Sequence, residues 1–265
     1  MNQEPTLGGV QTSSAPASRN ALAIPIAIVL SAALIAGAIV YTGMQKGNPT
    51  QVGNGTNDQV TAEIEVAPVT EKDHIQGNPN APIVIVEYSD YDCPFCRVFH
   101  DTMTKIIAEY GAGGKVAWVY RHFPLEQLHP NAKKISEASY CVSELGGNEA
   151  FWKFTNALNN SRKIVYAEGT TNIKSVEPTD MARMSEFALA GGVDKSKFEA
   201  CYTSGKYKEQ VNQDVVAAMK TGARGTPYSI LMVGDQKGVI NGAQPYDTVK
   251  QMIDTIITQM DNSAQ

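Results

Sequence analysis

The sequence predicts an α/β domain, in which a mixed β-sheet flanked by helices carries an inserted helical block, preceded by one transmembrane helix. Three observations support this fold class. An apolar stretch without charges occupies residues 21–41. After a polar segment, a strand–helix–strand pattern is followed by a long stretch of helical periodicity. The chain then continues with two strands and a helix, and this order is typical of a mixed sheet interrupted by a helical insertion.

The composition is that of a globular protein with enough apolar residues for a sizeable core. Of the 265 residues, 43% are hydrophobic and 18% are charged. The net charge is −5, so no excess of basic residues is available to neutralise phosphates, and we expect no nucleic-acid partner. Four cysteines are too few for a miniprotein built on disulfides. They suit one reactive dithiol, with room for one structural bridge.

The N-terminal part of the chain is expected to hold a membrane anchor. Residues 1–20 are small and polar and are expected to form a disordered tail. As a helix, the apolar stretch 21–41 would be about 31 Å long, close to the hydrocarbon thickness of a bilayer. A buried soluble helix of this length normally shows a polar stripe. We therefore expect a transmembrane anchor at 21–41, followed by a flexible linker rich in Gly and Asn at residues 42–60.

A cleaved signal peptide is the alternative interpretation of the apolar stretch. Residues 36–38 have the Ala-Gly-Ala spacing that such a cleavage site needs. The apolar run continues through Tyr41, however, and is longer than the hydrophobic part of a usual signal peptide, so we expect the anchor to be retained. Arg19 lies on one flank, whereas Lys46 on the other is soon followed by acidic residues. The positive-inside tendency then places the N-terminus in the cytoplasm and the domain outside.

The remaining chain, residues 61–265, is expected to form one domain. Its first strand is predicted at residues 83–88, where a nearly continuous run of apolar, β-branched residues is typical of a strand buried on both faces. A helix should begin near Phe95, because apolar residues recur there with a period of about 3.6 residues. They are Val98, Phe99, Met103, Ile106, Ile107 and Tyr110. A second strand is predicted at residues 116–123 and ends before Pro124.

The middle of the domain has helical periodicity from about residue 130 to residue 221. Five helices are predicted in this insertion, at residues 132–145, 149–158, 179–190, 195–203 and 207–219. Strands at residues 228–233 and 238–241 flank Gly234-Asp235 and should form a hairpin. An amphipathic helix at residues 246–260 follows.

The segment Cys93-Pro94-Phe95-Cys96 lies where the first strand ends and the helix begins. A C-x-x-C segment in that position places the first sulfur at the helix N-terminus, where unpaired N–H groups and the helix dipole favour a thiolate. We expect this sulfur to be exposed. The second sulfur, one turn further in, would be placed to attack a mixed disulfide. The segment is therefore a candidate redox-active dithiol.

Other roles of a C-x-x-C pair agree less well with the sequence. Zinc requires four ligands, and Cys141 and Cys201 are isolated, with no histidine at the spacing of a zinc finger. Arg97 follows Cys96, which excludes the C-x-x-C-H pattern of haem attachment. Two inert buried thiols are the third alternative. We expect neither a metal nor another cofactor.

Two further positions are candidates for the chemistry of the dithiol. Glu87 lies near the end of the first strand, six residues before Cys93, and a carboxylate buried there would accept the proton of Cys96. A glutamate that points to solvent is the alternative. Thr226-Pro227 precedes a predicted strand, and a cis-proline loop explains a proline in that place, although an ordinary trans turn also fits.

The segment Glu87-Tyr88-Ser89-Asp90-Tyr91-Asp92-Cys93-Pro94-Phe95-Cys96 resembles the active-site segment of DsbA-like thiol–disulfide oxidoreductases of the thioredoxin superfamily. Further motifs resemble that family and occur in the same order. They are Arg121-His122-Phe123-Pro124-Leu125, His129-Pro130-Asn131-Ala132, Phe151-Trp152, Gly225-Thr226-Pro227 and Gly242-Ala243-Gln244-Pro245-Tyr246. The resemblance covers roughly residues 70–260.

This resemblance implies a thioredoxin fold with a helical insertion. It implies that Cys93 is the nucleophile, that Cys96 is the resolving cysteine and that Glu87 is the buried carboxylate. It also implies that Thr226 and a cis Pro227 face the dithiol as the peptide-binding loop. The catalytic set is then Cys93, Cys96, Glu87, Thr226 and Pro227, and the substrate-binding set is Pro94, Phe95, Thr226 and Pro227.

The same resemblance suggests a second cysteine pair and a set of partners. In several DsbA-like relatives, two cysteines at places similar to Cys141 and Cys201 form a disulfide within the helical block; two separate buried thiols are the alternative. The implied activity is oxidation of cysteines in exported proteins outside a bacterial cytoplasmic membrane, with re-oxidation by a membrane partner of the DsbB or VKOR type. We expect a monomer. A disulfide reductase or isomerase of the cell envelope, and a non-catalytic surface protein with this fold, are the competing functions.

Two acidic residues oppose a strongly oxidising dithiol. Asp90 and Asp92 flank Cys93 and would raise the pKa of its thiol. The segment also lacks the histidine between the cysteines that helps to stabilise the thiolate in the best-known relatives. We expect the two carboxylates to be exposed and therefore screened by water and salt, so that the helix N-terminus has the larger effect.

Overall fold

The computed structural model describes residues 64–170 and 172–263. The predicted tail, anchor and linker at residues 1–60 therefore lie outside the described residues. Within the two described ranges, no helix combines the length and the apolar character needed to cross a bilayer.

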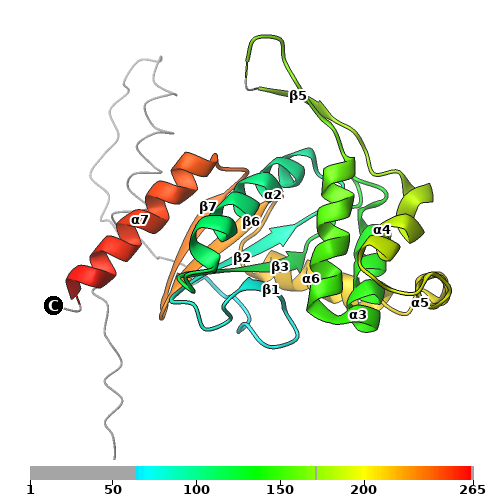
Figure 1. Ribbon diagram of the computed structural model, residues 1–265, viewed down its shortest axis with the longest axis horizontal. Coiled ribbons are helices and arrows are strands. Elements are labelled where there is room, and N and C mark those ends of the chain that lie inside the picture. Colours follow the sequence, from blue (N-terminus) through cyan, green and yellow to red (C-terminus); the bar gives the residue numbers. More distant parts are fainter. Residues whose placement is uncertain (1–63, 171, 264–265) are drawn as a thin grey trace, which may run out of the picture.

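A five-stranded sheet in the order β1-β3-β2-β6-β7 forms the centre of the domain (Figure 1). Its strands are β1 (His74–Gly77), β2 (Ile83–Ser89), β3 (Val116–His122), β6 (Tyr228–Val233) and β7 (Gln236–Asn241). β2 and β3 run parallel, whereas the other neighbouring pairs are antiparallel, which confirms the predicted mixed sheet. The sequence analysis missed β1, a short strand with only one apolar side chain, and began β7 two residues too late.

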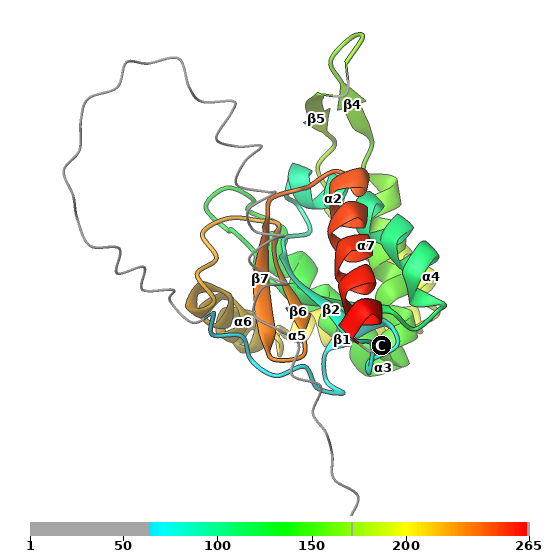
Figure 2. The same ribbon diagram turned by 90° about the vertical axis from the view of Figure 1, so that its left-hand side faces the viewer.

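Helices cover both faces of this sheet (Figure 2). One face packs against α2 (Pro94–Ile106), α7 (Tyr246–Ser263) and the first helices of the insertion, and the other packs against α6 (Lys208–Lys220), the last helix of the insertion. Side chains of β2 alternate between the two cores: Ile83 and Ile85 belong to the first, and Val86 and Tyr88 to the second. The same alternation places Glu87 on the face that α2 covers.

The helical insertion begins with α3 (Ala132–Ser161), which is broken at Gly147. The φ of Gly147 is 72°, a left-handed value that glycine adopts without steric cost, so the segment comprises two helices, as predicted. α5 (Lys195–Ser204) also agrees with its prediction. The helix predicted at residues 179–190 is shorter, because a 3₁₀ turn at Met181–Arg183, capped by Asp180, precedes α4 (Met184–Ala190).

A β-hairpin interrupts the insertion and was not predicted. Its strands are β4 (Ile164–Tyr166) and β5 (Ile173–Val176), and it projects away from the body of the domain (Figures 1 and 2). Val165 and Tyr166 are exposed on it. The segment between residues 130 and 221 is therefore not entirely helical.

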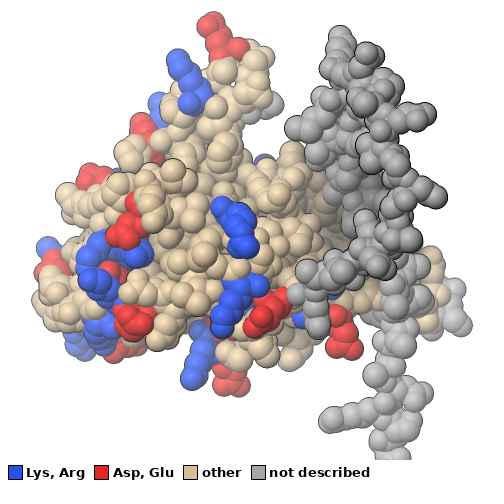
Figure 3. Space-filling model, turned by 180° about the vertical axis from the view of Figure 1, so that it is seen from behind, with Lys and Arg blue, Asp and Glu red and all other residues tan. Residues whose placement is uncertain are grey.

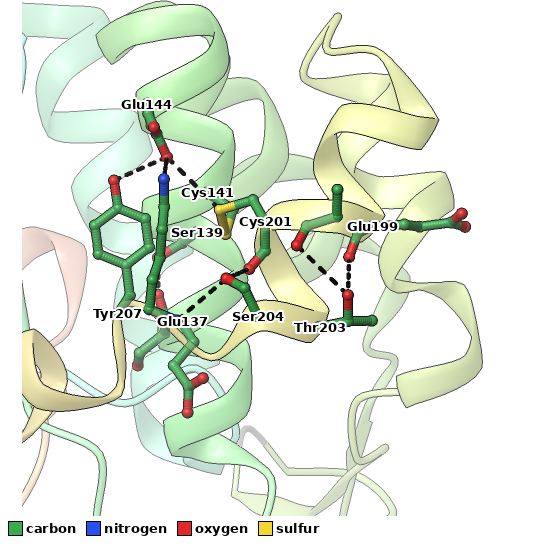
Figure 4. Close-up of a disulfide and its surroundings, with 12 residues drawn as sticks. Glu137, Ser139, Cys141, Glu144, Glu199, Cys201, Thr203, Ser204 and Tyr207 are labelled. Atoms are coloured by element: carbon green, nitrogen blue, oxygen red, sulfur yellow. Dashed lines mark hydrogen bonds and ion pairs between the residues drawn. A yellow bond between two sulfur atoms is a disulfide. The ribbon is translucent and has the colours of Figure 1, made fainter.

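A disulfide joins α3 to α5 through Cys141 and Cys201 (Figure 4). The two Cα atoms are 5.8 Å apart, within the range that a disulfide spans. Glu144 lies beside the bridge and forms an ion pair with Lys206 and a hydrogen bond with Tyr207. The structure thus contains the bridge rather than two separate thiols, and it closes a loop between residues separated by 60 positions.

Replacing both Cys141 and Cys201 by Ser should lower the free energy of unfolding by about 2–4 kcal/mol, because the unfolded chain regains the entropy that a long closed loop removes. Denaturant titration would measure this. The comparison belongs in a background in which Cys93 and Cys96 are both Ser, so that the bridge in the insertion is the one redox-dependent difference. An unchanged unfolding midpoint would contradict a stabilising role.

Candidate active site

The dithiol lies at the junction of β2 and α2. Cys93 is the residue before the helix and has extended backbone angles (φ −65°, ψ 128°), and Pro94 occupies the first helical position. The N–H group of Arg97 donates to the carbonyl of Cys93 at 3.2 Å, so the first turn of α2 begins at the dithiol. The unpaired N–H groups of this turn favour negative charge at the position of the Cys93 sulfur.

Both cysteines are buried, which corrects the prediction of an exposed first sulfur. Cys93 is 3% exposed and Cys96 is 4% exposed, and both are free thiols. The Cys93 thiol lies against the loop before β6 and donates to the carbonyl of Thr226 at 3.5 Å. Phe95 is instead the exposed side chain of the segment, at 56%. The exposed fraction of the whole residue therefore does not distinguish the two cysteines.

The peptide bond between Thr226 and Pro227 is cis, so the alternative of a trans turn is wrong. Strand pairing explains why this loop meets the dithiol. β2 and β6 are antiparallel, with Tyr88 opposite Tyr228, so the end of one strand lies beside the start of the other. The dithiol follows the end of β2, and the cis-proline loop precedes β6. The structure thus brings Cys93 together with Thr226 across 133 positions of sequence.

The two thiols differ in their affinity for protons. A hydrogen bond from the Cys96 thiol lowers the pKa of Cys93 to about 6, an effect that exceeds the opposing effect of burial. Thr226 contributes in the same direction. Burial, followed by the interaction with Cys93, raises the pKa of Cys96 well above its ordinary value. The pair is therefore built to hold one proton and one negative charge, with the charge on Cys93.

Glu87 lies inside the protein and is 1% exposed, so the alternative of a solvent-facing glutamate is wrong. Trp118 donates from Nε1 to its carboxylate at 2.8 Å. Burial raises the pKa of Glu87 to about 7, and its negative charge in turn raises the pKa of Cys96. A carboxyl with this pKa can gain or lose a proton near neutral pH.

Asp90 and Asp92 are buried, which corrects the prediction that water and salt screen them. Asp90 is fully buried and is a hydrogen-bond acceptor for the loop. Its carboxylate accepts from the backbone N–H groups of Asp92, Cys93 and Leu125 and from Nδ1 of His129. The Asp90 charge raises the pKa of Cys93, whereas its hydrogen bond raises the pKa of His129. Asp92 accepts from the N–H group of Thr179 at 2.9 Å.

Arg162, the first residue after α3, was not among the predicted site residues. Its side chain is buried, at 1% exposure, and donates to backbone carbonyls of the loop that carries Cys93. No local pattern marks it, because a basic residue at the end of a helix is ordinarily a solvated one. The sequence of the dithiol loop could have indicated only that the backbone carbonyls of residues 91–93, if buried, needed hydrogen-bond donors.

The remaining histidines and aromatic residues have structural partners. His100 pairs through Nε2 with Asn156 at 2.8 Å, and His122 pairs with Ser139. His74 stacks on Phe151 at a ring distance of 3.6 Å. Within the described residues, no group of three His, Cys, Asp or Glu side chains is arranged to hold a metal ion. Phe151, Trp152 and Phe154 are buried in the core of the insertion.

A sequence profile for a family described as Thioredoxin matches residues 69–255. The chain belongs to this thioredoxin family. Solved structures that share its fold include BdbD from Bacillus subtilis (TM-score 0.58, 21% identity, 74% of this chain and 98% of that chain) and α-DsbA1 from Wolbachia pipientis (TM-score 0.56, 22% identity, 74% and 96%). The domain therefore has the thioredoxin-family fold that these two proteins share, and its dithiol lies at the start of α2 beside the cis-proline loop.

A curated relative shares part of this thioredoxin domain. It is named Na(+)/H(+) antiporter NhaA 1, from Mycolicibacterium gilvum (strain PYR-GCK), and is 32% identical over 159 residues. The match covers 59% of this chain and 23% of that protein, so the chain spans less than a quarter of the relative's length.

In the reduced protein, iodoacetamide should modify Cys93 much faster than Cys96, because the pKa of Cys93 is about 6 and that of Cys96 is raised. The rate at Cys93 should reach half its maximum near pH 6. Peptide mass spectrometry after short labelling at several pH values measures both rates. Equal rates, or faster labelling of Cys96, would reverse the roles of the two thiols.

The Glu87→Gln variant should change how stability depends on pH. The folded protein holds the Glu87 proton up to about pH 7, whereas the unfolded chain releases it near pH 4.5, so wild-type stability should fall across this window as pH rises. The variant lacks this loss, and its stability relative to wild type should increase by on the order of 2–3 kcal/mol between pH 4.5 and pH 7. Denaturant titration of both reduced proteins tests this; parallel profiles would show that the folded-state pKa of Glu87 is ordinary.

Proposed function

We propose that this protein introduces disulfide bonds into exported proteins, with Cys93 as the nucleophile and Cys96 as the resolving cysteine. The observation that carries this proposal is the placement of the Cys93 thiol at the start of α2 and against the carbonyl of Thr226 in the cis-proline loop. The opposite directions of the two thiol pKa shifts support it. A stable Cys93 thiolate stabilises the reduced dithiol, and a dithiol whose reduced form is stabilised is an oxidant.

The reaction begins with the Cys93–Cys96 disulfide. A client thiolate attacks the Cys93 sulfur, the disulfide breaks, and Cys96 leaves and takes a proton from the neighbouring Glu87 carboxyl. A second client thiolate then attacks the client sulfur of the mixed disulfide, and Cys93 leaves as a thiolate. The client gains one disulfide and the enzyme gains two electrons. Low basicity makes Cys93 the better leaving group in the second step.

The client is proposed to bind along the cis-proline loop and the exposed part of the dithiol segment. Thr226 and Pro227 lie at the start of β6 beside Cys93, and Pro94 and Phe95 form the adjoining surface. We expect the client to bind as an extended peptide. Its backbone can then pair with the backbone of the cis-proline loop and bring the client cysteine to the Cys93 sulfur.

The site of action is proposed to be the extracytoplasmic side of a bacterial membrane, to which residues 21–41 would tether the domain. A structural disulfide in the insertion supports an oxidising compartment. Re-oxidation would pass two electrons to a membrane partner of the DsbB or VKOR type. Ion transport, named for the curated relative, is not proposed, because the chain spans less than a quarter of that protein.

One observation favours a reductase or isomerase as the second candidate function. The fully buried Asp90 carboxylate raises the pKa of Cys93, which weakens the thiolate and thereby the oxidising power of the pair.

On the face shown in Figure 3, basic and acidic side chains are intermixed, so no strongly charged patch there selects one class of client.

Oxidation of a reduced, unfolded cysteine-containing protein tests the proposal. The pre-oxidised protein should form client disulfides stoichiometrically, and Cys93→Ser should abolish this. Reduced Cys96→Ala, mixed with a client that already contains a disulfide, should accumulate mixed disulfides through Cys93, because no second enzyme thiol is left to release the client. The Cys141→Ser/Cys201→Ser variant serves as a control for a disulfide elsewhere in the domain and should retain oxidation. The proposed roles would be rejected if Cys93→Ser still oxidised the client. They would also be rejected if only the Cys141→Ser/Cys201→Ser control lost this activity.

Membrane association tests the proposed location. Because the apolar run continues past residue 38, the mature full-length protein should keep its N-terminus and sediment with membranes. Protein sequencing and fractionation measure the two properties. A soluble mature product that begins near Ile39 would show that the segment is a cleaved signal peptide.

A further inference from the structure

Arg162 is buried where the chain leaves α3 and enters the β4–β5 hairpin. It has extended backbone angles and is among the largest fully buried side chains of the domain. Burying a guanidinium without partners is costly, by several kcal/mol even after relaxation. The hydrogen-bond partners of the guanidinium therefore show which part of the protein it stabilises.

The Arg162 side chain donates hydrogen bonds to four backbone carbonyls. Nη1 donates to the carbonyls of Tyr91 and Cys93, the latter at 3.4 Å, and Nη2 donates to the carbonyl of Asp92 at 2.7 Å. Nε donates to the carbonyl of Glu177 at 3.0 Å. Three consecutive residues of the dithiol loop thus share one guanidinium. Because carbonyls carry no net charge, these hydrogen bonds leave the positive charge of Arg162 in place.

This charge lies beside several buried negative groups. Asp90, Asp92 and the two thiols all interact electrostatically with Arg162. Other basic side chains at the loop are already paired: His129 lies 2.8 Å from the Asp90 carboxylate, and Arg97 lies 2.5 Å from that of Asp101. Ionisation of Cys93 adds a second negative charge near Asp90. In this poorly solvated site, the fixed positive charge of Arg162 offsets it.

The position of Arg162 is itself fixed from both sides. Nε of Arg97, the residue after Cys96, donates to the Arg162 carbonyl at 3.2 Å. Just after the second strand of the hairpin, the N–H group of Thr179 donates to the Asp92 carboxylate at 2.9 Å. The base of the hairpin is therefore attached to both the loop and the first turn of α2, so the guanidinium is held against the loop.

We propose that Arg162 is a positioning residue that holds the backbone of the dithiol loop and keeps a positive charge beside the Cys93 thiolate. The inference deepens the proposed function, on which it rests. It explains how a loop that contains two buried aspartates can still hold a thiolate. The unpredicted hairpin then has a definite place in the site, because Arg162, two residues before β4, brings the charge.

The test compares Arg162→Met, which removes the charge and the donors, with Arg162→Lys, which keeps the charge on a side chain that lacks the planar fork. Arg121→Met is the matched control. Arg121 is also largely buried and donates to two backbone carbonyls, those of Ala67 and Pro68, and its ion pair is with Asp73, away from the dithiol. All three are made in the full chain and compared with wild type after reduction.

The measurement is the rate of Cys93 alkylation as a function of pH, which gives the pKa of Cys93 and the limiting rate of its thiolate. Arg162→Met should raise this pKa by about one unit or more, so that alkylation below the wild-type pKa slows about tenfold. Arg162→Lys should raise it less and should lower the limiting rate, because the loop loses its forked donor. Arg121→Met should leave both quantities at their wild-type values.

The proposal is overturned by an Arg162→Met profile equal to wild type, or by an equal shift in Arg121→Met, which would indicate general destabilisation. If Arg162→Met does not fold, Arg162→Lys decides: a wild-type profile rejects the proposal, and an altered one supports it. Alkylation requires no client protein. A failure of client oxidation by the wild type would therefore reject the proposed function and leave this result standing.

Discussion

Cys93 has to ionise in a place where little water reaches its sulfur. Burial alone would raise the pKa of this thiol, and the neighbouring Asp90 charge would raise it further. The rest of the site compensates for these two effects. The Cys96 thiol donates a hydrogen bond, the first turn of α2 directs N–H groups at the sulfur, and Arg162 supplies positive charge. The Cys93 thiolate is therefore stabilised by several buried groups around it rather than by exposure to water.

The fold assembles these groups from distant parts of the chain. β2 carries Glu87 and ends at the dithiol loop, and β6, its antiparallel neighbour, begins directly after the cis-proline loop. The helical insertion contributes from the other side, because Arg162 follows α3 and contacts the loop across about 70 positions of sequence. The disulfide between α3 and α5 lies in this same insertion. The insertion therefore both covers the sheet and completes the site.

The sequence predicted the parts of this arrangement that are encoded locally. The β-branched run of β2, the apolar period of α2 and the C-x-x-C spacing each lie within a few residues, and the mixed sheet follows from their order. The β4–β5 hairpin and strand β1 were missed because each of these strands is only three or four residues long and has few buried side chains. The burial of Asp90 and the loop contacts of Arg162 depend on tertiary partners 35 or more positions away, so no local pattern contains them. For the same reason the loop was expected to be exposed.

The reduction potential of the Cys93–Cys96 pair tests the central claim most directly, because it measures how far the reduced dithiol is stabilised over the disulfide. Equilibration with glutathione buffers of known ratio gives this value. If hydrogen bonds and positive charge outweigh burial and the Asp90 carboxylate, the potential should lie above about −200 mV, on the oxidising side of thioredoxin at about −270 mV. A potential near or below about −250 mV would contradict the account and place the reductase function first.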